Sequence, residues 1–460
     1  MSSLVRFDRL IVAAIVALGL IIAALSVASA RLGPSVDSVS LAETLDGTSV
    51  NTQIGITFTS PMRPRTVERG FHISPNVAGD FSWVGNEVLF SPRRALRYDQ
   101  TYTVTLSTSA QDTDGKGLFR AFRRSFRTQS EHVLYLGTEG AEKNSLVLAS
   151  TSGAHRSLGG GRGLVTDFSL SFDRTLAVFV RRGASGERPD EIWLLSVDDG
   201  STQRMFRRPD WNISQPHFSP DGKYIVFLAT NVRMCRKYYG CFRDTSGPII
   251  EMLDLRSHRV QPFRSASDVP ITNFIDFSPA GQVAYTDLGS ALTLAQPNGS
   301  GVIHVPNQGN SLEFAGFDTA GDKAAFVGQT ASSTGGDILI YDRGKYLDVS
   351  RSVYDSSTPA LSNSGKSVAY AAYRGEQGIE PLYGINVYSF GSRKTLKLTA
   401  ERGWSDWTPA WSPDDRYVAF VRSQPQEAMY MGSGEIWVVR GDGSQAHPLG
   451  GIGKNPQWVA

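Results

Sequence analysis

The chain has 460 residues, with 46 lysine and arginine residues against 44 aspartate and glutamate residues, which gives a net charge of +2. This balance argues against a dedicated nucleic-acid-binding protein, because such proteins concentrate excess basic charge on one face. A chain of this length can hold two hydrophobic cores, and its 46 glycines and 22 prolines indicate many turns.

An uncharged apolar segment comes first. Residues 10–30 are rich in isoleucine, valine, leucine and alanine and have arginines on both sides. About 20 apolar residues can span a bilayer, whereas the apolar part of a secretory signal usually has about 7–15. We expect residues 1–31 to be a short cytoplasmic tail and an uncleaved transmembrane anchor of a single-pass cell-membrane protein, with the bulk of the chain extracytoplasmic. Ala28-Ser29-Ala30 also fits a cleavage site, so a cleaved signal peptide is the alternative.

Short alternating strands with proline and glycine turns between them occupy residues 34–129, which predicts a small β-sandwich. The expected strands are 53–58, 79–84, 87–90, 101–106 and 121–128. The segment Ile56-Thr57-Phe58-Thr59-Ser60-Pro61-Met62 resembles the opening of bacterial Ig-like domains of the S-layer SbsA type, and Asp114-Gly115 with Phe126-Arg127-Thr128 resembles their ending. Such domains act mostly as spacers or protein-contact modules, so the resemblance implies no chemistry.

Residues 131–460 repeat one pattern. The segment 217–227, His-Phe-Ser-Pro-Asp-Gly-Lys-Tyr-Ile-Val-Phe, recurs at 410–420 as Ala-Trp-Ser-Pro-Asp-Asp-Arg-Tyr-Val-Ala-Phe. Weaker copies begin near residues 170, 277, 317 and 361. A repeat of roughly 40–50 residues with four short strands is typical of a β-propeller blade. In the last full unit the expected strands are 408–412, 417–423, 435–440 and 445–449.

The two ends of this region supply complementary parts of one blade. Residues 455–460 match only the first strand of a repeat, whereas residues 132–137, 144–151 and 154–158 supply a second, third and fourth strand. Pairing these parts would close the ring and remove its open sheet edges. The sequence therefore predicts an all-β fold: a seven-bladed β-propeller with an N-terminal Ig-like β-sandwich and one N-terminal transmembrane helix.

The turns of the repeat resemble the WSPDG repeats of TolB-like propellers over about 330 residues. Several copies depart from this pattern, since Phe172 replaces the proline in one turn and Asn363-Ser364 replaces Pro-Asp in another. The resemblance implies the fold, and the departures leave an inherited function open.

Signatures of catalysis are missing from the sequence. It contains no Gly-x-Ser-x-Gly elbow, His-Glu-x-x-His motif or phosphate-binding loop. The seven histidines are scattered and form no pair at metal-ligand spacing. Asp112-Thr113-Asp114-Gly115 lacks the later ligands of a calcium loop, so it predicts a turn. We therefore expect no catalytic residues, no metal and no cofactor.

A long insertion, residues 231–248, separates the second and third strands of one blade and contains both cysteines of the chain. In an exported protein, Cys235 and Cys241 most simply form one local disulfide, and two free thiols are the alternative. Hairpin loops usually need about two to five residues, and long ordered loops often have a function. We therefore expect this loop to recognise a partner.

Loops between second and third strands, and between blades, emerge on one face of a propeller because strand direction alternates. Aromatic and arginine residues dominate binding hot spots, and this face collects many of them. The alternative is that these aromatic side chains only pack between neighbouring loops. The predicted binding face contains Trp211, Arg236, Lys237, Tyr238, Tyr239, Tyr373, Trp404, Trp407 and Tyr430.

The predicted function is that of a membrane-anchored extracytoplasmic propeller on an Ig-like stalk, which binds an envelope protein, a peptide or a glycan without catalysis. One alternative is a carbohydrate-active enzyme, a glycosidase or a lyase, with its site at the central channel. The other is a purely architectural envelope protein. A cluster of carboxylates or histidines at the channel would favour the enzyme.

Because residues 10–30 are long enough to span a bilayer, we expect the native protein to stay in the membrane fraction after carbonate extraction. N-terminal sequencing should find a start before residue 10. A carbonate-extractable product that begins at Arg31 would identify the segment as a cleaved signal instead.

Overall fold

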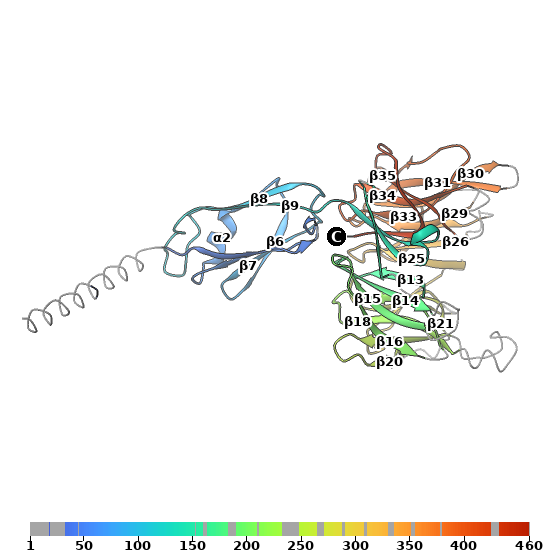
Figure 1. Cartoon of the computed structure of the whole chain (residues 1–460), viewed down its shortest axis with the longest axis horizontal. Coiled ribbons are helices and arrows are strands. Elements are labelled where there is room, and N and C mark those ends of the chain that lie inside the picture. The colour runs from blue at the N-terminus through green and yellow to red at the C-terminus, as the bar shows by residue number, and fades with distance from the viewer. Residues whose placement is uncertain are drawn as a thin grey trace, which may run out of the picture. The chain divides into compact units, whose positions relative to one another are not determined.

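The structure is a computed structural model that describes residues 18, 33–44, 46–151, 153–159, 163–182, 190–208, 211–231, 248–264, 271–287, 290–307, 311–329, 335–350, 355–377, 380–424 and 432–459. The chain divides into two compact units, Met1–Thr128 and Gln129–Ala460 (Figure 1). The predicted anchor lies outside the described residues except for Leu18. Within the described ranges, no helix is both long and apolar enough to cross a membrane.

The first unit consists of antiparallel sheets. One sheet has four strands in the order β1 (Val36–Ser40), β4 (Ile54–Phe58), β7 (Glu87–Pro92) and β6 (Gly79–Val84). The other has three, β5 (Phe71–Ser74), β8 (Thr101–Leu106) and β9 (Phe122–Arg127), and a small ribbon pairs β2 (Glu43–Thr44) with β3 (Gly47–Thr48). A short helix, α2 (Pro64–Gly70), precedes β5.

The core of this unit is aromatic and aliphatic. The rings of Phe71, Phe81 and Phe90 lie with their centroids 4.9 to 5.2 Å apart, which joins β5 to β6 and β7. The five predicted strands are confirmed within two residues at their ends, whereas β1, β5 and α2 were not predicted. Strand β1 has only two apolar residues in five and is held by its backbone pairing with β4, so hydrophobic periodicity could not reveal it.

The second unit contains five separate four-stranded sheets, each built from consecutive antiparallel strands. The first two sheets are β13 (Leu164–Leu170), β14 (Leu176–Arg182), β15 (Asp190–Ser196) and β16 (Thr202–Arg208), and then β17 (Trp211–Phe218), β18 (Tyr224–Asn231), β19 (Ile249–Asp254) and β20 (Val260–Pro262). The next two are β21 (Ile271–Phe277), β22 (Val283–Asp287), β23 (Ser290–Ala295) and β24 (Ile303–Val305), and then β25 (Ser311–Phe317), β26 (Lys323–Gln329), β27 (Asp337–Asp342) and β28 (Lys345–Asp348). The fifth is β29 (Ser356–Leu361), β30 (Ser367–Gln377), β31 (Glu380–Ser389) and β32 (Lys394–Lys397).

One further sheet has seven strands and joins the two ends of the unit. Its order is β12 (His155–Leu158), β11 (Leu146–Ser150), β10 (His132–Gly137), β36 (His447–Trp458), β35 (Gly434–Arg440), β34 (Tyr417–Ser423) and β33 (Ser405–Trp411). A single 3₁₀ turn, Gly140–Glu142, follows β10. The first strands of neighbouring sheets pack against one another, as β13 does on β17 and β29 on β33, which is the arrangement of a β-propeller.

The repeated serine has a physical cause. In the turns that begin at Ser171, Ser219 and Ser412, the hydroxyl donates to the aspartate two residues later at 2.6 to 2.7 Å. The same hydroxyl accepts the backbone N–H of the residue five positions later, at 2.9 to 3.0 Å. One serine therefore closes the turn and starts the next strand, which explains why Ser-x-Asp marks the blades.

The C-terminal strand pairs with the strand that begins at His132, and this prediction is confirmed. Val133 faces Trp458 and Leu136 faces Lys454 in the antiparallel register. Two separate strands at 445–449 and 455–460 were expected, but β36 is continuous over twelve residues. Its first half pairs with β35 and its second half with β10, and Gly453 is the residue that pairs with both. The chain needs no turn here, because β36 runs straight on while its pairing partner changes from β35 to β10.

Close packing at this junction requires glycine. A Cβ atom at Gly451 or Gly453 would collide with the ring of Tyr135, which is fully buried against β36. The Tyr135 hydroxyl donates to Glu142 at 2.8 Å, and Glu142 also contacts Nδ1 of His155 at 3.0 Å. Burial, together with the Glu142 carboxylate, raises the pKa of Tyr135.

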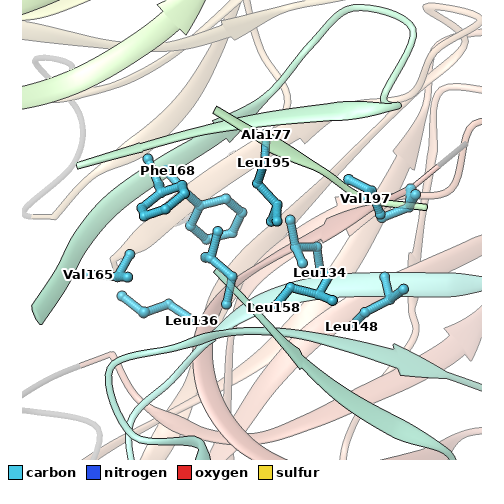
Figure 2. Packing of buried hydrophobic residues seen from close by; sticks show 12 residues of the cluster. Leu134, Leu136, Leu148, Leu158, Val165, Phe168, Ala177, Leu195 and Val197 are labelled. Carbon is cyan, nitrogen blue, oxygen red and sulfur yellow. The ribbon is translucent and has the colours of Figure 1, made fainter. Parts of the chain in front are cut away.

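Buried apolar clusters lie on both faces of the sheet that closes the unit. Leu134 and Leu148 of the seven-stranded sheet meet Phe168 and Leu195 of the β13–β16 sheet in one buried cluster (Figure 2). Trp458 packs in a second cluster and donates its indole N–H to the carbonyl of Ala410 at 2.9 Å. Each sheet therefore packs against the next by side chains on its faces, while the closure also uses main-chain pairing.

We predict that Trp458→Ala destabilises the second unit by ~3–5 kcal/mol, because it removes a large, fully buried side chain and leaves a cavity. The change is measured by chemical denaturation monitored by far-ultraviolet circular dichroism, which reports on the backbone rather than on tryptophan. Trp404→Ala, which truncates a more exposed indole, is the matched control and should cost far less. Equal midpoints for Trp458→Ala and the intact protein would contradict the packing described.

Candidate binding face and channel

Several residues of the predicted binding face lie outside the described residues, so their geometry stays a prediction. These are Arg236, Lys237, Tyr238, Tyr239 and Tyr430, and the same holds for the predicted disulfide between Cys235 and Cys241. The structure does place Trp211, Tyr373, Trp404 and Trp407.

Two of the predicted aromatic residues pack together with a third. Tyr373 on β30 is paired with Tyr383 on β31, with ring centroids 6.1 Å apart, and the Tyr383 ring lies 4.1 Å from that of Trp407 on β33. The Tyr383 hydroxyl donates to Asp355 at 2.8 Å, and burial with this carboxylate raises the pKa of Tyr383. For these three side chains, packing between neighbouring elements describes the geometry.

Arg374 fixes the connection between β32 and β33. Its Nη2 atom donates to three backbone carbonyls, those of Tyr383 at 2.9 Å, Glu401 at 3.1 Å and Trp404 at 2.8 Å. Burial lowers the pKa of Arg374, although the nearby carboxylates of Asp406 and Glu401 oppose this effect. The Trp404 backbone is therefore held in place while its side chain is 36% exposed.

A buried ion pair also holds the connection between β32 and β33. Arg422 on β34 makes two hydrogen bonds to Asp406, at 2.7 and 3.0 Å, and both side chains are almost fully buried. Arg422 also pairs with Glu401 and lies 4.4 Å from the centre of the Trp437 ring. Burial opposes its charge, but the hydrogen bonds and charge of Asp406 outweigh that effect and raise the pKa of Arg422.

Sequence analysis missed Arg374, Asp406 and Arg422. The available signal was a charged residue at the end of an otherwise apolar strand, as Arg422 is in Tyr417–Ser423. Two buried donors here, Nε of Arg374 and Nε1 of Trp407, have no hydrogen-bond partner among the described residues. An unpaired buried polar group costs ~1–3 kcal/mol.

Trp211 lies elsewhere, at the start of β17. The guanidinium of Arg208 is stacked 4.5 Å from its ring, and Arg208 also donates to the buried Glu251 at 2.6 Å. Trp211 is thus part of a cation–π contact in another sheet, separate from the cluster around Trp407.

The first strands of three sheets carry linked polar groups. Nδ1 of His217 on β17 lies 3.2 Å from a carboxylate oxygen of Asp276 on β21. Asp167 on β13 accepts the backbone N–H of Gln215 at 2.7 Å, and the Gln215 side chain accepts the N–H of Ile275 at 3.1 Å. These bonds run from sheet to sheet along the inner strands.

No group of three or more potential metal ligands occurs in the part of the chain that the structure describes. Asp112 accepts the backbone N–H of Lys116 at 2.8 Å, and the segment is a turn as predicted. A cavity of 440 Å³ lies beside the turns at Ser392, Asp415 and Gly441, at the opposite ends of the strands from Trp404. It contains none of the predicted binding-face residues.

We expect the His217–Asp276 pair to give the unit a pH dependence. Burial favours its neutral form, but the charge and hydrogen bond of Asp276 outweigh this and raise the pKa of His217. A raised folded-state pKa adds stability that is complete below the unfolded value of about 6.5 and is lost as pH rises through the folded pKa.

We predict that Asp276→Asn, which can still accept the N–H of Phe277, flattens this loss. Melting temperatures measured between about pH 5 and 9 test this, and an unchanged slope would rule out the pair as its source.

Residues 30–128 match the bacterial Ig-like domain family. No curated protein matches the chain. Among solved structures, TolB from Acinetobacter baumannii is similar at 14% identity with a TM-score of 0.42, over 85% of this chain and 83% of that protein. An oligogalacturonate lyase from Vibrio parahaemolyticus has 14% identity and a TM-score of 0.46, over 63% of this chain and 87% of that chain.

The propeller domain of the Trilobed protease from Pyrococcus furiosus has 11% identity and a TM-score of 0.46, over 77% of this chain and 93% of that chain. Because these TM-scores lie below 0.5, nothing about the function of this chain is inferred from them. The chain combines a domain that matches the bacterial Ig-like family at residues 30–128 with a β-propeller marked by Ser-Pro-Asp-Gly turns.

Proposed function

We propose that this protein is a non-catalytic binding protein that recognises a protein or peptide partner through the face around Trp404. The observation that supports this most directly is the way buried charges hold that residue. Arg374 binds the carbonyl of Trp404, and Arg422 binds Asp406 two residues later. The exposed indole is thus presented on a fixed backbone.

Such an arrangement suits recognition for energetic reasons. An aromatic side chain on an ordered connection loses little conformational freedom on binding, which lowers the cost of association. Nε of Arg374 and Nε1 of Trp407 are buried and have no hydrogen-bond partner within the described part of the chain, and such groups are rare in native proteins. Retaining them in one cluster supports a role beyond packing.

The remaining parts of the proposal concern the setting of this face. We propose that residues 10–30 anchor the chain in the cell membrane and that residues 34–129 act as an extracytoplasmic spacer. We also propose a seven-bladed ring, in which the seven-stranded sheet counts as two blades that share β36. The loop with Arg236, Lys237, Tyr238 and Tyr239 would extend the binding face, closed by the disulfide between Cys235 and Cys241.

An enzyme at the central channel is the second candidate. The His217–Asp276 pair at 3.2 Å is the observation that favours it, since such a pair can act in acid–base catalysis. Asp167, whose charge also acts on His217, already accepts the backbone N–H groups of Gln215 and Phe168. Asp276 likewise already accepts the backbone N–H of Phe277. We favour binding because the Trp404 connection is built with several buried charges.

Proximity crosslinking in the native envelope tests the proposal. We predict that Trp404→Ala lowers capture of the partner at least tenfold, because truncated hot-spot aromatics commonly cost ~2 kcal/mol or more. The matched control is Phe172→Ala, which removes an aromatic side chain with 44% exposure from the turn between β13 and β14, at the other end of the strands. This variant should capture the partner normally.

The outcomes separate the candidates. Equal capture by both variants and the intact protein would reject the Trp404 face. If the captured partner is a glycan and its capture depends on Trp404, the ligand is a saccharide and the proposed protein partner is wrong. A product formed from a saccharide, and lost in His217→Ala but not in Trp404→Ala, would establish the enzyme instead.

A further inference from the structure

Three departures from the repeated turn meet at one place. In the repeated turns the fourth residue has a left-handed backbone, with φ of 66° at Gly222 and 63° at Gly365. Arg174 and Asp415 occupy the same position in their turns, with φ of 62° and 59°. Side chains with a Cβ atom disfavour this conformation, so glycine would relieve the backbone at both positions.

Arg174 reaches across the ring. Its Nη2 atom donates to the side-chain oxygen of Asn363 at 2.9 Å, and its Nη1 atom lies 3.4 Å from the carbonyl of Trp458. Arg174 belongs to the β13–β16 sheet and Asn363 to the β29–β32 sheet. These two sheets are not neighbours, because three sheets separate them on one side and the seven-stranded sheet separates them on the other.

Asn363 is held in turn by Asp415. The Asp415 carboxylate accepts the backbone N–H groups of Asn363 and Ser364, at 2.7 and 2.9 Å, and the Asn363 side-chain amide at 3.1 Å. The same amide donates to the carbonyl of Ser412 at 2.8 Å. Thr319 of the β25–β28 sheet donates to the Asn363 side-chain oxygen at 3.3 Å.

We propose that Arg174, Asn363 and Asp415 form a latch across the turn face of the propeller. The β13–β16 sheet lies on one side of the β10–β36 closure, while β33 and the β29–β32 sheet lie on the other. The latch therefore spans the closure, resists opening of the ring there, and bridges the channel at this face. The proposal rests on the fold alone and is independent of the proposed binding function.

The alternative, that arginine is merely tolerated at position 174, predicts the opposite sign for one substitution. Glycine fits a left-handed backbone better than arginine does. If Arg174 only fills the position, Arg174→Gly should leave stability unchanged or raise it. If Arg174 holds the latch, the same substitution should lower stability although it relieves the backbone.

Arg343 provides a matched control. It has φ of 50° in the turn between β27 and β28, and its side chain is 90% exposed. Arg343→Gly therefore tests the same backbone change without a latch. We expect Arg343→Gly to leave the unfolding equilibrium constant unchanged or make it smaller, and Arg174→Gly to increase it about tenfold, the effect of losing a charge-assisted hydrogen bond.

A double-mutant cycle and hydrogen exchange complete the test. Asn363→Ala combined with Arg174→Gly should cost less than the sum of the two single changes, because both remove the bond between these side chains. Backbone amides of β36 that pair with β10 should exchange faster in Arg174→Gly than in Arg343→Gly. Arg174→Lys, which keeps the charge, covers the case in which the glycine variant does not fold, and it should fold with partial loss. Additive effects, or an Arg174→Gly variant as stable as the intact protein, would overturn the latch.

Discussion

The pairing of β36 with β10 is the constraint on which the second unit depends. Consecutive sheets can pack face to face, but an unclosed ring would leave an exposed strand edge at each end of the unit. Gly453 and Gly137, more than 300 residues apart in the sequence, meet at this point. Fixing two such distant segments has an entropic cost, which the buried Trp458 and the close fit of Tyr135 against glycine help to offset.

The turns on the opposite side from Trp404 show how a repeat can be both regular and specialised. A serine hydroxyl closes each of the best copies in the same way, so those sheets are built alike. Where the pattern changes, as at Arg174 and Asp415, both new side chains contact Asn363. Departures that look like decay of the repeat in the sequence are thus interactions between separate sheets.

Buried charge distinguishes the Trp404 side. An ion pair such as Arg422–Asp406 is weak support for stability, because removing both charges from water costs nearly as much as their attraction returns. Its clearer effect is geometric, since two hydrogen bonds and the stacked Trp437 ring permit few alternative positions of the connection. The Ig-like domain, in contrast, has a core of packed aromatic rings and displays no comparable charged cluster among its described residues.

The sequence by itself determined the blade repeat, the Ig-like domain and the sharing of one blade between the chain ends, because these depend on local turn chemistry and alternating apolar residues. Strand β1 and the continuous β36 could not be predicted from the sequence. Backbone pairing holds β1, and β36 is defined by a change of pairing partner from β35 to β10. The aromatic residues Tyr373 and Trp407 could be chosen from sequence, but their packing on Tyr383 could not. Arg374, Asp406 and Arg422 were decided only by the tertiary structure, because a charged residue in a strand is an exposed side chain or a buried partner according to what the neighbouring sheet places opposite it.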